Sequence, residues 1–181
     1  MDIFPLVILS LWVMLPAYIP NNAAAIFGKG TPLDFNRSWR GNRIFGDGKT
    51  IRGTIFGILF GILTAIFLNI LNQHFSSVLG FDFPIFPIVV TVGIPIGSLL
   101  GDAFASFIKR SLNIPRGHSM PLLDQLDFVI GSLSLAFIIS PVWFFETFSM
   151  PIILTIFLLT PILHLCINAI GYLMGIKKVP W

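Results

Sequence analysis

The chain has 181 residues, of which 55% are hydrophobic and only 10% are charged, and its mean hydropathy is +0.91. A soluble domain carries about 25% charged residues, so this composition excludes an ordinary soluble protein. It also excludes a disordered chain, because so apolar a sequence must bury itself. A disulfide scaffold is excluded because Cys166 is the single cysteine. The composition therefore predicts an integral membrane protein, with residues 1–181 forming one domain.

Five long apolar segments predict an all-α polytopic membrane protein, since a spanning helix needs about 20 mainly apolar residues. The expected helices cover about 3–20, 53–71, 84–108, 124–146 and 151–175. The first segment begins without Lys or Arg, which favours a retained helix over a cleaved signal peptide. Asp102 and Asp124 then lie near helix ends, where a carboxylate is less costly than at the bilayer centre.

The charged residues predict how the chain is oriented in the membrane. With five helices, the basic segments all fall on one side, and they are Lys29 to Arg52, Lys109 to Arg116 and Lys177-Lys178. The other side keeps only acidic residues, which are Asp2, Asp82 and Glu146. Because cytoplasmic loops collect Lys and Arg, we expect the N-terminus outside and the C-terminus in the cytoplasm. The net charge of +3 and pI of about 9.4 then suit anionic headgroups and nucleotides better than nucleic acid.

The first basic loop contains the motif NRIFGDGKTIRG at residues 42–53. Its glycines alternate with short polar and basic residues, so backbone amides and cations can turn toward phosphate oxygens. It is not a P-loop, because Arg43 stands where that motif needs glycine. The alternative is a loop that serves only to hold the topology. A purely topological role accounts for Arg37 and Arg40, but it accounts less well for Asp47 and the closely spaced glycines.

The second basic region brings polar residues to one helical face. Asp102, Ser106 and Lys109 share that face, with Arg110 at its edge. The alternative for Lys109 and Arg110 is contact with phospholipid headgroups.

Asp124 and Asp127 also share a face, at the start of the fourth expected helix. Two carboxylates so close repel each other, and a divalent cation between them would remove that repulsion. Hard oxygen ligands beside phosphates suit Mg²⁺, so we expect Mg²⁺ as the cofactor. The alternative for Asp124 is a helix N-cap.

Glycines recur at every fourth position of the second and third expected helices, at Gly53, Gly57 and Gly61 and at Gly93, Gly97 and Gly101. This spacing lets membrane helices approach closely. If the two helices pack antiparallel, the two polar motifs meet in one pocket. The alternative is that glycine is simply frequent in membrane helices. His164 and Cys166 are expected to be packing residues, and nothing resembles a zinc site.

Together, NRIFGDGKTIRG and the pattern GDAFASFIKR…PLLDQLDF at residues 101–128 resemble the CDP-archaeol synthases, the membrane cytidylyltransferases of archaeal ether-lipid synthesis. The second pattern is also similar to the signature of the larger CDP-diacylglycerol synthases. The chain departs from that signature between Arg110 and Asp124, where an acidic residue is missing and RGHSMP replaces a glycine-rich run. This departure favours the archaeal branch and leaves the roles of Arg116 and His118 open.

The resemblance implies transfer of CMP from CTP to 2,3-bis-O-(geranylgeranyl)glycerol 1-phosphate, giving a CDP-lipid and pyrophosphate. The implied catalytic residues are Lys109, Asp124 and Asp127, and the implied metal ligands are Asp124, Asp127 and Asp102. The expected nucleotide-binding residues are Asn42, Arg43, Asp47, Lys49, Thr50, Arg52, Ser106 and Arg110. The expected partners are CTP, the prenylated glycerol phosphate and membrane lipids but no nucleic acid, and the chain is expected to be a monomer or homodimer.

Three alternatives remain at this point. A CDP-diacylglycerol synthase-like enzyme would differ in its lipid. A CDP-alcohol phosphotransferase would show a longer Asp-Gly…Ala-Arg…Gly…Asp…Asp pattern, which is not found in this sequence. A small carrier would carry polar residues near the middle of its spans, whereas here they gather toward one face of the membrane.

Overall fold

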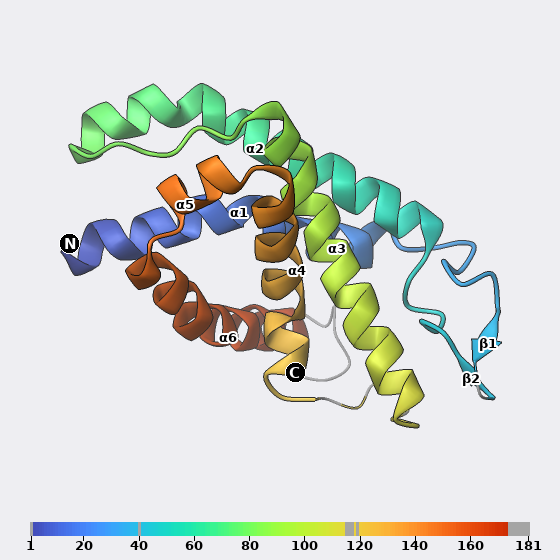
Figure 1. Cartoon of the computed structure of the whole chain (residues 1–181). Helices are drawn as coiled ribbons and strands as arrows, with labels where there is room; N and C mark the ends of the chain where they lie inside the picture. Colours follow the sequence, from blue (N-terminus) through green and yellow to red (C-terminus); the bar gives the residue numbers. More distant parts are fainter. Residues whose placement is uncertain (1, 40, 115–117, 119, 174–181) are drawn as a thin grey trace.

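The computed structural model describes residues 2–39, 41–114, 118 and 120–173, and helices make up most of them (Figure 1). The helices are α1 Ile3–Phe27, α2 Ile51–Leu79, α3 Ile88–Ser111, α4 Leu123–Ile139, α5 Pro141–Thr147 and α6 Met150–Leu173. A short antiparallel hairpin of β1 (Ser38–Trp39) and β2 (Asn42–Arg43) lies in the connection between α1 and α2. The predicted helical membrane architecture is confirmed, with this hairpin as an addition.

Among the described residues, four helices are long and apolar enough to cross a membrane: α1, α2, α3 and α6. Helix α4 has 17 residues, at the short end of the range for a spanning helix. The prediction of one continuous helix over 124–146 is wrong, because the chain breaks at Ser140 (φ −148°, ψ 69°) and α5 begins at Pro141. Proline disfavours helical geometry in the residue before it, which accounts for the break.

The other helix boundaries differ from those expected mainly in length. Helix α1 continues to Phe27 with Pro16 and Pro20 inside it, because membrane helices tolerate proline where neighbouring groups satisfy the freed carbonyls. Helix α2 begins after Thr50, whose hydroxyl oxygen accepts a hydrogen bond from the Gly53 N–H at 3.0 Å. Its C-terminal cap is Gly80 at φ 77°, a left-handed conformation that glycine adopts without strain.

Helices α1, α3, α4 and α6 enclose the buried core, whose most enclosed members include Val13, Met14, Ile94, Val129 and Ile156. In Figure 1, α4 lies between α3 and α6. Removing these side chains from lipid gives little hydrophobic gain, so close packing must hold the helices together.

The glycine ridge of α3 packs against α4 rather than against α2. A Cβ atom at Gly97 would lie 2.6 Å from the carbonyl oxygen of Gly131, and one at Gly101 would collide with the backbone carbonyl of Asp127. The α3 ridge therefore does not face the α2 ridge. The contact fixes α4 against α3 at the level of Asp127.

The ridge of α2 packs against both α1 and α3. A Cβ atom at Gly57 would lie 2.8 Å from the carbonyl oxygen of Pro20 and 2.9 Å from Leu99, and one at Gly61 would lie 2.6 Å from Pro95. Because the order of contacts along α3 reverses that along α2, these two helices are antiparallel. Residues just before α2 and near the end of α3 therefore lie together, as antiparallel packing of the two helices requires.

We expect Gly101→Ala to lower the stability of the protein, because the new methyl group has no space against the Asp127 carbonyl. Overpacking of this kind costs about 1–3 kcal/mol, and each kcal/mol lowers the Tm of a chain of this size by roughly 2–4 °C. Thermal unfolding in detergent measures the change. Leu100→Ala is the matched control, since Leu100 is 59% exposed on the same helix. Equal Tm values for the two variants would contradict the packing argument.

Candidate active site

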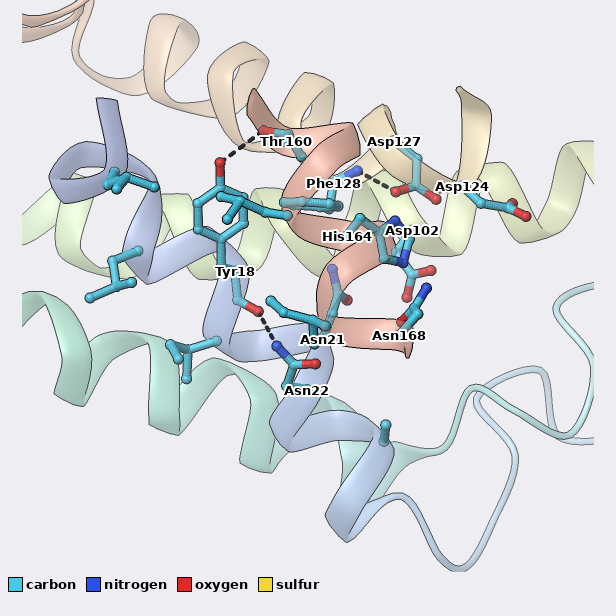
Figure 2. Close-up of a pocket in the computed structure, with 16 residues that line it drawn as sticks. Tyr18, Asn21, Asn22, Asp102, Asp124, Asp127, Phe128, Thr160, His164 and Asn168 are labelled. Atoms are coloured by element: carbon cyan, nitrogen blue, oxygen red, sulfur yellow. Dashed lines mark hydrogen bonds between the residues drawn. The ribbon is translucent and has the colours of Figure 1, made fainter. Parts of the chain in front are cut away.

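A cavity of about 370 Å³ lies between α1, α3, α4 and α6 (Figure 2). Three carboxylates line it, those of Asp102, Asp124 and Asp127. The polar side chains that join them are Tyr18, Asn21, Asn22, Thr160, His164 and Asn168. The remaining lining is apolar: Leu11, Leu15, Ile19, Ala25, Phe128, Leu163 and Ile167. The cavity thus combines an acidic end with walls that suit a hydrocarbon.

An ion pair joins the two sequence motifs at this cavity. Lys49, just before α2, pairs with Asp102 on α3. Both side chains also line a smaller hollow of about 90 Å³, to which Gly48 and Thr50 contribute. Because Asp102 borders both spaces, the hollow and the cavity are neighbours. The prediction that the two polar motifs meet is confirmed.

A second lysine pairs with a second carboxylate. The Lys109 Nζ atom lies 2.8 and 2.9 Å from the two carboxylate oxygens of Asp124, and the Met120 N–H donates to the same carboxylate at 2.9 Å. Asp124 lies in the first turn of α4, whose N-cap is Leu122. The N-cap alternative for Asp124 is therefore wrong. Lys109 is only 14% exposed in this pair, so a role confined to headgroup contact does not account for it.

Asp127 is the most buried of the three carboxylates, at 8% exposure. One of its oxygens accepts a hydrogen bond from the Phe128 N–H at 2.6 Å (Figure 2). It lies one helical turn from Asp124, so both side chains reach the same cavity.

The donor chemistry of this acidic end fits Mg²⁺. Within the described residues, no three His, Cys, Asp or Glu side chains are close enough to form a complete metal cage. Mg²⁺ does not need one, since it is usually held by one or two carboxylates together with water and substrate phosphates. Asp124 and Asp127 supply such carboxylates, and Asp102 borders the same cavity as a third.

Asp34 organises the loop between α1 and α2. Its side chain is fully enclosed and accepts hydrogen bonds from the Arg43 guanidinium at 2.6 and 3.2 Å. The N–H groups of Asn36, Phe45 and Gly46 donate to it at 3.1 Å. Burial raises the pKa of Asp34, but these hydrogen bonds, led by that from Arg43, outweigh burial and hold the pKa at about 2.

We expect Asp34→Asn to loosen this loop at neutral pH, because a carboxamide cannot replace a carboxylate with five donors. Hydrogen bonds to a charged group contribute about 1.5–3 kcal/mol, so trypsin should cut within residues 29–49 roughly tenfold faster. Asp47→Asn is the control, since Asp47 pairs with the same Arg43 but is 65% exposed, and exposed pairs contribute little. Equal cleavage of both variants would contradict a central role for Asp34.

The pH dependence of the wild-type loop follows from the same carboxylate. The folded-state pKa of Asp34 is depressed, so its contribution to loop stability is complete above the ordinary value of 3.8 and is lost as the pH falls through about 2.

The other predicted nucleotide-binding residues lie around the loop. Asn42 donates to Asn113 at 2.6 Å, which ties the hairpin to the end of α3. Arg43 pairs with Asp34 and, at 2.8 Å, with Asp47, and these pairs raise the pKa of Arg43. The Arg110 side chain donates to the carbonyl of Ile114. Of these contacts, the one between Asn42 and Asn113 joins the loop to the end of α3.

Three further predicted residues lie apart from the acidic cavity. Thr50 is buried as the cap of α2. Arg52 lies 5.6 Å from the ring of Phe56 and lines a separate open hollow with Lys29. Ser106 is half-buried on α3 and does not line the cavity or the smaller hollow beside it. Arg40 and Arg116 lie outside the described residues, and His118 is exposed.

Several residues that the fold brings to the site were not predicted from the sequence. His164, expected to be a packing residue, lines the cavity with Asn168, both from α6. Asn21 reaches it from α1. A polar side chain inside an apolar helix is a general signal of function, and it could have singled out these three residues. Asp34 gave no comparable signal, because a lone carboxylate in a loop is ordinary.

The comparisons with known proteins agree on one family. The family described as CarS-like, CDP-archaeol synthase, matches residues 3–181. Over 181 residues that cover both chains completely, the chain is 44% identical to the CDP-archaeol synthase of Halobacterium salinarum and 46% identical to that of Haloarcula marismortui. A solved structure, described as an intramembrane enzyme for archaeal membrane lipid biosynthesis, superposes with a TM-score of 0.72 at 30% identity, covering 87% of this chain and 91% of that one.

Proposed function

Because this chain belongs to the CDP-archaeol synthase family, and is thus a membrane-embedded enzyme of the cytidylyltransferase type that forms CDP-archaeol, we propose its specific reaction. It transfers CMP from CTP to 2,3-bis-O-(geranylgeranyl)glycerol 1-phosphate with Mg²⁺ and releases pyrophosphate. The observation that carries this proposal is the pairing of Lys49 with Asp102 and of Lys109 with Asp124 beside one cavity with apolar walls.

The chemistry needs positive charge more than it needs a base. A lipid phosphate oxygen attacks the α-phosphorus of CTP in line, the bond to the β-phosphate oxygen breaks, and pyrophosphate leaves. The attacking phosphate monoester is already largely ionised at neutral pH, since its second pKa is about 6. The barrier lies in bringing two anions together and in stabilising the charge on the leaving group.

The residues of the cavity meet these needs in distinct ways. Asp124 and Asp127 would hold Mg²⁺, which supplies positive charge against the triphosphate, and Asp102 borders the same cavity as a third carboxylate. Lys49 and Lys109 would neutralise phosphate oxygens, and Arg110 follows Lys109 directly on α3. The loop organised by Asp34 brings Gly48 and Lys49 to the smaller hollow.

The apolar lining supports an acceptor that stays in the membrane. Leu11, Leu15 and Leu163 line the cavity together with the acidic residues, so a prenyl chain can lie along them while its phosphate reaches the carboxylate end. We place this end at the cytoplasmic face, where CTP is found and where the basic loops are expected.

The decisive assay uses purified protein in detergent with labelled CTP, Mg²⁺ and the geranylgeranylated glycerol phosphate. We expect one CDP-lipid and one pyrophosphate for each CTP consumed, and loss of turnover with EDTA that Mg²⁺ restores. Diacylglycerol phosphate as acceptor tests the CDP-diacylglycerol alternative. Adding a CDP-lipid with glycerol phosphate tests the phosphotransferase alternative, for which release of CMP would overturn the proposal.

A further inference from the structure

Asn21 on α1 carries a buried amide oxygen with no hydrogen-bond partner among the described residues. Buried acceptors are nearly always paired, so an unpaired one calls for an explanation. The amide nitrogen is engaged, because it donates to the Ser98 hydroxyl on α3 at 3.3 Å. The amide nitrogen of this side chain is therefore paired, whereas the amide oxygen has no partner among the described residues.

Ser98 determines which way round the amide lies. Its hydroxyl is fully buried and donates to the carbonyl oxygen of Ala17 at 2.8 Å. A hydroxyl has one proton to donate, so toward Asn21 it can only accept. A flipped amide would set two acceptors against each other. The hydrogen-bond chain therefore fixes the Asn21 oxygen as the end of the amide that has no partner among the described residues.

Asn21 lies where a nucleotide base would lie under the proposed function. Asn21 and Asp102 line both the large cavity and the smaller hollow, and Figure 2 shows Asn21 between Tyr18 and Asp102. Small residues form much of the hollow's wall: Ala24, Ala25, Gly48, Gly53 and Ala103. Lys49 lines the same hollow. A narrow space of about 90 Å³ beside the phosphate-binding residues suits a flat, uncharged ring.

We propose that Asn21 recognises the cytosine base, its Oδ1 atom accepting a hydrogen bond from the exocyclic N4 amino group. The assignment rests on the proposed function, since it takes CTP as the nucleotide. Cytosine presents a donor where uracil presents a carbonyl oxygen, so an acceptor fixed by Ser98 favours CTP and repels UTP. Asn21 is thus a specificity-determining residue, and it takes no part in phosphoryl transfer.

The first test compares kcat/KM for CTP and UTP in Asn21→Leu, which keeps the size of the side chain and removes the acceptor. We expect the CTP-to-UTP ratio to fall about tenfold, the scale expected for losing one buried, specific hydrogen bond. The ratio does not depend on the folded fraction, because both nucleotides are assayed on one preparation. A wild-type ratio in Asn21→Leu would overturn the proposal.

Ser98→Ala tests the orienting role, because it frees the amide to flip and should also lower the ratio. Ser132→Ala is its matched control. Ser132 is equally buried and donates to the Ile94 carbonyl at 3.1 Å, at the contact of α3 with α4. The control should keep the wild-type ratio. Equal ratios in the two serine variants would contradict orientation by Ser98.

Calorimetry separates recognition of the base from binding of phosphate. With Mg²⁺ present, Asn21→Leu should bind CTP more weakly and inorganic tripolyphosphate as well as wild type does. Equal losses for both would assign Asn21 to the metal or the phosphates and would overturn the proposal. These tests separate failure of the Asn21 assignment from failure of the proposed function. If the proposed function is wrong, the wild-type protein itself forms no CDP-lipid.

Discussion

Asp127→Asn is expected to reduce CDP-lipid formation about 100-fold or more. Asp127 is enclosed in the cavity beside Asp124, so the amide removes the charge of a proposed metal ligand without changing the shape of the side chain. Loss of one group that stabilises transition-state charge costs about that much in kcat. Asp124→Asn is expected to match it, since it also deprives Lys109 of its partner. Turnover with labelled CTP, at several Mg²⁺ concentrations, measures both.

The control for the carboxylate variants is Asp82→Asn. Asp82 is an exposed carboxylate in the connection between α2 and α3, and it should keep wild-type turnover. All three variants should be extracted as monodisperse protein with similar Tm values. Near-normal turnover in both Asp124→Asn and Asp127→Asn would remove the metal-binding proposal.

Lys109→Met is expected to lower kcat/KM for CTP roughly 10- to 100-fold. The variant keeps much of the aliphatic stem but removes the charge that faces Asp124 at 2.8 Å, and charge-assisted contacts to phosphate are among the stronger hydrogen bonds. Lys29→Met is the matched control, because Lys29 is exposed and lines a different hollow. A change of less than about threefold for Lys109→Met would mean that Lys109 serves membrane topology alone.

Features governed by local sequence were predictable. Long apolar segments located the helices because bilayer thickness sets their length. The spacing of Asp102, Asp124 and Asp127 placed carboxylates on helical faces, and the structure brings all three to one cavity. The break at Ser140 also had a local signal in Pro141, which the expectation of a single helix did not use.

Features that depend on which segments meet were not predictable. Glycines at every fourth position show that a helix can be approached closely, but they do not identify the neighbour. The Gly97 and Gly101 ridge met α4 instead of α2 for this reason. Asp34 is important only because the loop folds back, so that the Arg43 guanidinium and the N–H groups of Phe45 and Gly46 reach its carboxylate. The hydrogen-bond partner of Asn21, Ser98, likewise comes from another helix.

The two lysine–carboxylate pairs affect the charge balance of the site before substrate binds. Lys49 and Lys109 already neutralise Asp102 and Asp124, so two of the three cavity carboxylates are balanced before substrate binds. If Mg²⁺ and CTP bind as proposed, the carboxylates of these two pairs would turn to the cation while the ammonium groups turn to the phosphates. Substrate binding would then be an exchange of ionic partners, in which no member of the two pairs is left desolvated and alone.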